Sequence, residues 1–445
     1  MLLAHRNILL MSILKHRHKF FLLLMLAFLF RLGFGLCSAF QDADSTQIYL
    51  LGLKFYTTGA WPYFGPDVVW GEIQIPGALQ GWLVGSPLFV LPIAEAPYIL
   101  LNIISFLSLC LLAWYCCKRL PGLPRWFVWT WLLTSPWTLS LSTNIYNPSY
   151  LLAGGILFFV GALEIYPFTT RKLIDIRLAN MMLGFSLFWA MQLHLSWVLL
   201  MPYGIIAFYC QAKEGGRRLL KAIAWFALGG TMTGSLLLPT YLKYGFMRGT
   251  GGTTWAVVPN LHNLSAIVGI LKRSISFAVF DVSSFIGGHT ADRIAFFKAE
   301  PWLIPIVIFL SLIGIAQAIA LFVFWFKRDS EQPDWRAIKY LLVFNVCLIY
   351  ISFLFSIKPP QSNHLYLTFP LPMIYSLYVW NRLLQEKRWQ RLAKAFLVCG
   401  IIFHVGLALY SFPRTSLYPV RPRVQSAIDN KDYRILGERR PNTLY

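Results

Sequence analysis

Apolar stretches long enough to cross a bilayer recur along the whole chain, and none of them alternates apolar and polar positions as a barrel strand would. A backbone in lipid must satisfy its own hydrogen bonds, so these stretches predict transmembrane helices. The sequence therefore predicts an all-α polytopic membrane protein with about eleven transmembrane helices. The predicted spans are residues 20–39, 97–117, 126–142, 149–168, 179–193, 197–211, 222–241, 301–326, 340–357, 365–381 and 395–411.

Composition and charge agree with this class and orient the helices. Of the 445 residues, 57% are apolar and 13% are charged, and the formal net charge is +21. Lys and Arg gather in short segments on one side of the predicted spans, which the positive-inside rule places in the cytoplasm. These segments are too dispersed to form a basic domain that could hold nucleic acid. They cover residues 118–125, 171–177, 213–221, 327–339 and 382–394.

Three segments on the opposite side are too long to be simple turns, and long loops often carry function. They are a first outer loop at 40–96, a large outer loop at 242–300 and a short basic tail at 412–445. The first outer loop predicts two interfacial helices, at about residues 45–58 and 76–90, because it is rich in Tyr, Trp and Leu and poor in charge. Residues 1–411 are expected to form one transmembrane module.

Two carboxylates, Asp42 and Asp44, follow the first predicted helix directly. Asp44 is as well explained by an N-cap of the next helix as by a catalytic site. Asp42 lies nearest the membrane, where an unpaired charge is costly, so a catalytic or binding site explains Asp42 better than a solvated loop does. Glu72 adds a carboxylate to the same loop, and a solvated loop accounts for it equally well.

Arg31 lies inside the first predicted span, about two turns from its outer end. A charge at this depth either snorkels to the headgroups or pairs with an inward carboxylate or a lipid phosphate. Further along, His194 ends the fifth span, where a lone histidine more often packs than binds a ligand. Lys358, His364 and Tyr366 together offer a cation, a titratable donor and a phenol, which suits an anion site.

Several other chemistries lack their motifs. The glycines at 249–252 are not followed by the lysine of a phosphate-binding loop, and no nucleophile elbow is present. The 7 cysteines show neither a disulfide framework nor a metal-ligand spacing. No metal and no cofactor are expected from these patterns.

Taken in order, Arg31, the acidic pair, Tyr49, the Gly59-Ala-Trp-Pro-Tyr63 stretch and the helix at Pro76 resemble the GT-C glycosyltransferases. This superfamily includes the protein O-mannosyltransferases and the lipid A aminoarabinose transferase. The resemblance is best over the first 120 residues and weak beyond them. Later stretches that look like signatures of the family are Gln192-Leu-His194 and His364-Leu-Tyr366-Leu-Thr-Phe-Pro370.

The resemblance implies a polyprenyl-phosphate sugar donor and a lipid, glycan or protein acceptor, with the active site on the outer face of what we expect to be a bacterial inner membrane. It implies that Asp42 or Asp44 activates the acceptor, with Glu72 as a second carboxylate of the loop. Metal independence is expected, because the second outer loop carries Asn144 and Asn147 where metal-dependent members have carboxylates. Inversion is expected because the acceptor would attack opposite the leaving phosphate. The groups expected around the donor phosphate and cavity are Arg31, His194, Arg248, Lys358, His364 and Tyr366.

Two other functions stay open. A flippase or transporter would place ionisable groups near the bilayer midplane and show repeated halves, and the sequence has few such charges and no repeat. A polysaccharide polymerase or ligase would use Arg and His of a large outer loop. The loop at 242–300 is compatible with this function, because it contains Arg248, Arg273, His289 and Arg293.

Overall fold

The computed structural model describes residues 2–38, 43–68, 73–146, 148–169, 171–245, 258–327, 333–356 and 359–437. Asp42, Glu72, Arg248 and Lys358, which the sequence singled out, lie outside these residues, as does Asn147.

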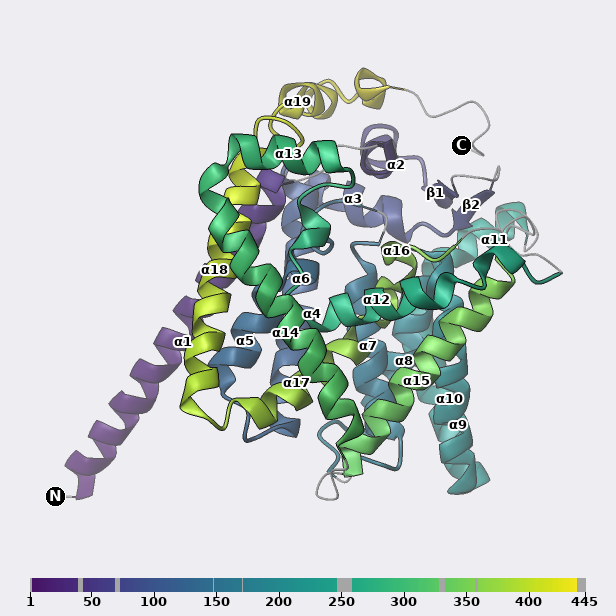
Figure 1. The fold of residues 1–445 in the computed structure, drawn as a ribbon. Coiled ribbons are helices and arrows are strands. Elements are labelled where there is room, and N and C mark those ends of the chain that lie inside the picture. Colours follow the sequence, from purple (N-terminus) through teal and green to yellow (C-terminus); the bar gives the residue numbers. More distant parts are fainter. Residues whose placement is uncertain are drawn as a thin grey trace.

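Within the described residues, seven helices are long and apolar enough to cross a membrane, and each coincides with one predicted span. They run between the two ends of the molecule in Figure 1. The all-α polytopic prediction is therefore confirmed. The seven are His18–Ser38 of α1 (Leu2–Ser38), α4 (Ala96–Arg119), Leu195–Lys213 with η1 (Leu195–Leu200) and α9 (Met201–Lys213), Gly216–Tyr244 with α10 (Gly216–Gly234), η2 (Ser235–Leu237) and α11 (Leu238–Tyr244), Pro301–Phe326 with η5 (Pro301–Leu303) and α14 (Ile304–Phe326), Asp334–Leu354 of α15 (Pro333–Leu354), and α18 (Lys387–Ser411).

The remaining predicted spans form shorter helices. Proline explains two of them, because it donates no backbone hydrogen bond and disturbs the preceding turn. Pro136 separates two helices within 126–142, and Pro370 starts a new helix within 365–381. The shorter helices are α5 (Arg125–Thr134), α6 (Pro136–Ser140), α7 (Leu151–Ile165), α8 (Ile176–Met191), α16 (Ser362–Leu365), η6 (Tyr366–Thr368) and α17 (Pro370–Leu383).

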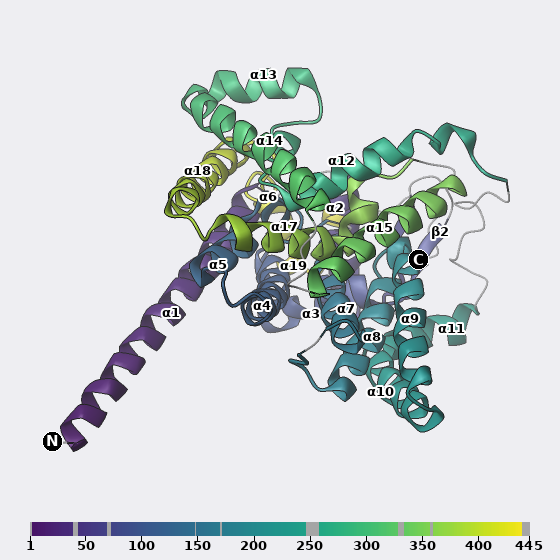
Figure 2. The same cartoon turned by 60° about the horizontal axis from the view of Figure 1, so that its bottom comes forward.

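Helix α7 shows why an apolar stretch need not be a lipid-facing span. Every residue of α7 except Leu157 is buried, so protein rather than lipid surrounds it. Towards the N-terminal end of α1, the first side chains that the structure describes are the opposite case: Phe21 and Leu23 are 69% and 64% exposed, as expected for a lipid-facing surface. Figure 2 shows this end of α1 extending beyond the other helices.

The first outer loop forms a layer at the upper end of Figure 1. It contains α2 (Ala43–Thr58) and α3 (Leu79–Val90), which confirm the two helices predicted there, and a hairpin of β1 (Phe64–Val68) and β2 (Ile73–Pro76), which was not predicted. α2 and α3 meet backbone to backbone, since a Cβ on Gly85 would lie 2.5 Å from the carbonyl oxygen of Gly52. Small residues allow this close approach.

Three further helices belong to the large outer loop and the tail: α12 (Ala266–Ala278), α13 (Thr290–Ala299) and α19 (Arg421–Asp429). In Figure 1, α13 and α19 lie at the upper end of the molecule, whereas α12 lies near its middle. α19 is held on the first outer loop, because Arg421 forms an ion pair with Glu95 and Gln425 Nε2 donates to the carbonyl oxygen of Pro92 at 3.0 Å. The tail therefore covers the first outer loop.

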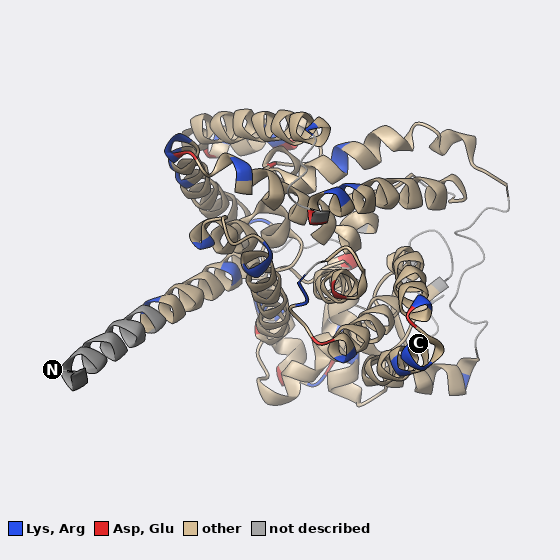
Figure 3. Cartoon of the chain, turned by 90° about the horizontal axis from the view of Figure 1, so that it is seen from below, with Lys and Arg blue, Asp and Glu red and all other residues tan. Residues whose placement is uncertain are grey.

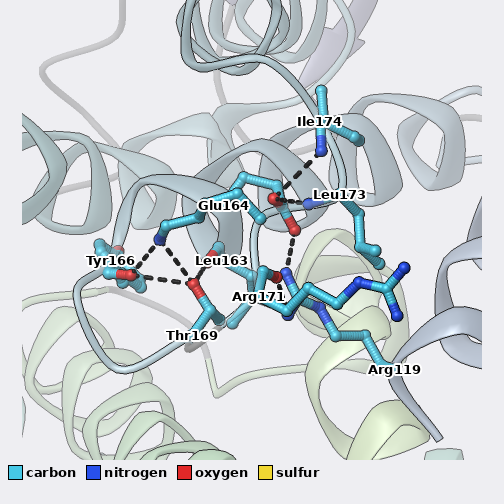
Figure 4. Close-up of polar contacts among 9 residues, drawn as sticks. Arg119, Leu163, Glu164, Tyr166, Thr169, Arg171, Leu173 and Ile174 are labelled. Carbon is cyan, nitrogen blue, oxygen red and sulfur yellow. Dashed lines mark hydrogen bonds and ion pairs between the residues drawn. The ribbon is translucent and has the colours of Figure 1, made fainter.

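The lower end carries blue Lys and Arg patches in Figure 3, which views the molecule from that side. A buried ion pair organises this end, as Figure 4 shows. Arg119, in the last turn of α4, binds Glu164 near the end of α7 and the carbonyl oxygen of Arg171. The second oxygen of Glu164 accepts the backbone N–H groups of Leu173 and Ile174 at 2.7 and 3.2 Å. One carboxylate thus ties α4, α7 and the connection to α8 together.

We expect Glu164→Ala to lower the free energy of unfolding by about 3–5 kcal/mol, because it leaves the nearly buried Arg119 without its partner. Chemical or thermal unfolding in detergent measures this change. Glu214→Ala is the matched control, since its pair with Arg218 is 44% and 47% exposed. That control should lose less than about 1 kcal/mol. Equal losses in the two variants would contradict the argument.

Candidate functional site

Arg31 is fully buried in α1 and joins three other helices. Its Nη1 atom donates to the carbonyl oxygen of Leu133 at 2.9 Å. Its Nη2 atom donates to the carbonyl oxygen of Thr138 at 3.1 Å and to Ser142 Oγ at 2.8 Å, and lies 3.4 Å from Ser105 Oγ on α4. The guanidinium group therefore reaches both sides of the α5–α6 break.

The break itself explains these contacts. Ser135 is extended, with φ −67° and ψ 150°, so the last carbonyl groups of α5 lose their helical donors. In a membrane no water replaces those donors, and an unsatisfied carbonyl is costly. Arg31 supplies N–H groups to the last turn of α5 and to the last turn of α6. The structure does not show snorkelling. Within the described residues, Arg31 bonds to backbone carbonyl oxygens and serine hydroxyls and not to a carboxylate.

Tyr366 reaches the same short helix from the other side. It is fully buried in η6, and its hydroxyl donates to the carbonyl oxygen of Trp137 at 3.0 Å. Arg31 and Tyr366, which are far apart in the sequence, therefore both bind the backbone of α6. The Tyr366 hydroxyl could donate to a phosphate only by giving up this protein contact, whereas Nε of Arg31 has no hydrogen-bond partner within the described residues.

His194 and His364 come together, with ring centroids 5.6 Å apart. Each caps a short helix through Nδ1: His194 accepts the N–H of Ser196 at 3.1 Å, and His364 accepts the N–H of Gln361 at 3.0 Å. Burial, helped by the neighbouring His364, lowers the pKa of His194 to about 3. His194 is therefore neutral at physiological pH and offers Nε2–H as a donor, not a positive charge.

Asp44 lies in the first turn of α2 and is half-buried. A carboxylate there is stabilised by the free N–H groups and the dipole of the helix N-terminus, so its position fits a structural role as well as a catalytic one. The other carboxylates proposed for catalysis, Asp42 and Glu72, are outside the described residues.

The second outer loop contacts the end of α1, close to the acidic pair. Asn144 Nδ2 donates to the carbonyl oxygens of Ser38 and Ser140 at 3.4 and 3.2 Å. Sequence reasoning missed two buried neighbours of this contact, Asn102 and Tyr150. A polar residue inside an apolar span is a signal that could have found Asn102.

Of the three described candidate residues of the large outer loop, Arg273, His289 and Arg293, Arg273 is the one that reaches the bundle. Its guanidinium group lies 4.7 Å from the ring of Trp137, whose Nε1 donates to Ser276 Oγ at 3.0 Å. His289 and Arg293 are exposed on α13 and its N-terminal side. The described residues contain no group of three or more His, Cys, Asp or Glu side chains that could hold a metal ion.

An apolar groove of about 790 Å³ runs along α4, beginning at the end nearest α3. Its walls come from α3, α4, α7 and α8, and its apolar wall residues include Trp82, Ile99, Leu157 and Trp189. Leu107 on its rim is 61% exposed, so the groove opens sideways towards lipid. Its length and lining suit a hydrocarbon chain.

Comparison with known proteins defines the fold class. No protein-family model and no curated protein matches the sequence. The crystal structure of ArnT from Cupriavidus metallidurans bound to undecaprenyl phosphate is similar, with a TM-score of 0.51 and 11% identity over 94% of this chain and 77% of that chain. The chain is therefore a polytopic membrane protein with a GT-C type fold, and the likeness establishes the fold alone.

We expect Arg31→Lys to destabilise the protein by at least about 2 kcal/mol, because one ammonium group cannot replace a planar fork that bonds two helix ends. Thermal unfolding in detergent measures the loss. Arg217→Lys, at an exposed position, is the control and should unfold as the wild type does. If Arg31→Lys also unfolds at the wild-type temperature, the contacts of Arg31 do not hold the α5–α6 break.

We expect the free energy of unfolding to fall as the pH drops from about 6.5 towards 3. Unfolded His194 binds a proton in that range, whereas the buried side chain, with its pKa of about 3, does not. His194→Asn keeps a capping acceptor but cannot titrate, so unfolding curves between pH 7.5 and 5 should depend less on pH. The exposed His262→Asn is the matched control. Identical slopes for wild type and His194→Asn would contradict the expectation.

Proposed function

We propose that the chain is a membrane glycosyltransferase that moves a sugar from a polyprenyl-phosphate donor to a hydroxyl group on a lipid, glycan or protein. The observation that carries the proposal is the likeness of the fold to ArnT over 94% of the chain, in a structure that holds undecaprenyl phosphate. The apolar groove along α4 supports it, because a lipid-borne substrate needs a hydrocarbon-lined surface inside the membrane.

The proposed chemistry uses the acidic start of the first outer loop. The carboxylate of Asp42 or Asp44 takes the proton of the acceptor hydroxyl, and the resulting oxygen nucleophile attacks the anomeric carbon. The new carbon–oxygen bond forms as the bond to the lipid phosphate breaks, and the polyprenyl phosphate leaves. Attack opposite the leaving group inverts the anomeric centre. Glu72 is proposed as a second carboxylate of this loop, and no metal or cofactor takes part.

The leaving phosphate needs nearby donors and positive charge. We propose Arg248 and Lys358 as its cations and the His194–His364 pair as N–H donors lining the cavity. The closeness of the two histidine rings supports a shared role. Arg31 and Tyr366 are proposed to support this site through the backbone of α6, to which both bind.

We also propose that the reaction takes place on the outer face of a bacterial inner membrane. The short basic segments gather at the end of the bundle opposite α2 and α3, and basic loops favour the cytoplasm. The tail helix α19 covers the same end as the first outer loop, which supports an outer location for both.

The test is sugar transfer from a panel of labelled polyprenyl-phosphate sugars, using membranes that contain the protein. We expect Asp42→Asn or Asp44→Asn to lower the transfer rate by about 10²-fold or more, because general base catalysis is worth that much. Asp175→Asn is the matched control: it makes the same change at the N-cap of α8, where asparagine caps as well as aspartate. Its rate should not change.

Full activity in both single variants and in the double variant would contradict the proposal. Substrate flux in proteoliposomes without any covalent product would instead indicate a flippase. Loss of activity in Arg273 and Arg248 variants, with both aspartates dispensable, would indicate a polymerase or ligase.

A further inference from the structure

Asn102 Nδ2 joins α4 to the turn between α6 and α7 by donating to the carbonyl oxygen of Thr143. Asn102, together with Asn144 in this turn and Tyr150 at its end, carries a buried polar atom without a hydrogen-bond partner among the described residues. Within the described part of the chain, the hydroxyl of Tyr150 and the Oδ1 atoms of Asn102 and Asn144 have no hydrogen bond. Tyr150 and Asn102 are fully buried. Leaving such a group unpaired in a protein interior costs about 1–3 kcal/mol, so each of them needs an explanation.

The contacts of the two amides hold their oxygens in place. Asn102 Nδ2 donates to the carbonyl oxygens of Tyr98 and Thr143 at 3.0 and 3.3 Å. Asn144 Nδ2 likewise donates to two carbonyl oxygens, one of them at the end of α1. Both amide nitrogens are therefore occupied by backbone carbonyls, and turning either amide over would set oxygen against oxygen. What remains available is the acceptor oxygen of each amide.

Tyr150 differs from a buried tyrosine with a purely structural role, and α7 offers the comparison. Tyr150 precedes the first residue of α7, and Tyr166 follows the last. Both are almost fully buried, yet the Tyr166 hydroxyl donates to the carbonyl oxygen of Tyr203 at 3.0 Å. The backbone carbonyl oxygen of Tyr150 accepts Trp189 Nε1 at 2.9 Å, but the Tyr150 hydroxyl has no hydrogen-bond partner within the described residues. Phenylalanine would fill the Tyr150 position without an unpaired hydroxyl.

The chemistry of the three groups indicates what they bind. Two amide oxygens accept hydrogen bonds, and one phenol can donate or accept. None of them carries a charge at neutral pH, so they suit neutral hydroxyl groups better than a phosphate or an ammonium group. The junction also touches Ser38, at the point where α1 ends and the first outer loop begins. A ligand bound here would therefore lie beside the start of that loop.

We propose that Tyr150, Asn102 and Asn144 bind the hydroxyl groups of the transferred sugar and so set which sugar the protein accepts. This inference rests on the proposed glycosyl transfer for the identity of the ligand. Its physical basis is independent of that reaction, because the three buried groups are unpaired in the protein alone. Burying these unpaired groups lowers the stability of the free protein, and a bound sugar that supplies the missing hydrogen bonds removes this cost.

The experiment compares Tyr150→Phe with Tyr166→Phe in purified full-length protein. The first readout is the rise in unfolding temperature produced by undecaprenyl phosphate and by undecaprenyl-phosphate sugars that differ in one hydroxyl group. We expect the best sugar donor to stabilise the wild type more than undecaprenyl phosphate does. In Tyr150→Phe that extra stabilisation should disappear, while the effect of undecaprenyl phosphate and the stability of the free protein stay at or above wild-type levels.

The second readout is the KM for the sugar donor in the transfer assay. Tyr150→Phe should raise it about tenfold, as expected for one lost hydrogen bond to substrate. Asn144→Ala should raise it as well. Tyr166→Phe should lower the stability of the free protein and leave the KM unchanged, because the Tyr166 hydroxyl bonds to a protein carbonyl and not to the sugar.

The inference is overturned if Tyr150→Phe and Asn144→Ala both keep the sugar-dependent stabilisation, or if no sugar donor stabilises the wild type beyond undecaprenyl phosphate. Loss of sugar-dependent stabilisation in Tyr150→Phe, in a protein that transfers no sugar, would support this site and contradict the proposed reaction. The two failures are therefore distinguishable.

Discussion

The guanidinium group of Arg31 allows a broken helix to exist inside this bundle. The α5–α6 break frees carbonyl groups at a depth where water cannot satisfy them, and Arg31 donates to Leu133, Thr138 and Ser142 on both sides of the break. Because Arg31 belongs to α1, the same contacts set the height of α1 against α6. The end of α1 and the turn after α6 lead into the first and second outer loops, so Arg31, together with the bond from Asn144 to Ser38, positions the start of both loops.

At the lower end of the molecule, a buried carboxylate rather than a buried guanidinium group satisfies unpaired backbone groups. Glu164 accepts backbone N–H groups from the irregular segment after α7, and Arg119 neutralises it. In both places a buried charged side chain satisfies backbone groups that no helix can satisfy. At the junction of Asn102, Asn144 and Tyr150, the two amide oxygens and the phenol hydroxyl have no hydrogen-bond partner within the described residues, and this is the observation behind the proposed sugar site.

The predicted fold agrees with the structure where hydropathy alone decides. The seven long spans and both interfacial helices of the first outer loop coincide with predicted segments. The prediction is less accurate for the four shorter segments, since hydropathy does not tell burial in protein from burial in lipid, and α7 is almost wholly enclosed. For the site, Arg31 and Tyr366 could be named from the sequence but not their shared partner α6. The roles of Asp42, Glu72, Arg248 and Lys358 stay predictions.

The sequence by itself determined the membrane class, the positions of the long helices and the side on which basic residues gather, because these depend on local composition and on the bilayer as solvent. Only the tertiary structure decided which polar groups meet. It brought His194 beside His364, set Arg31 against the backbone on both sides of the α5–α6 break, and left the Tyr150 hydroxyl unpaired within the described residues. Hydrogen bonding needs atoms within about 3 Å, and residues distant in sequence reach that spacing only when the helices have packed.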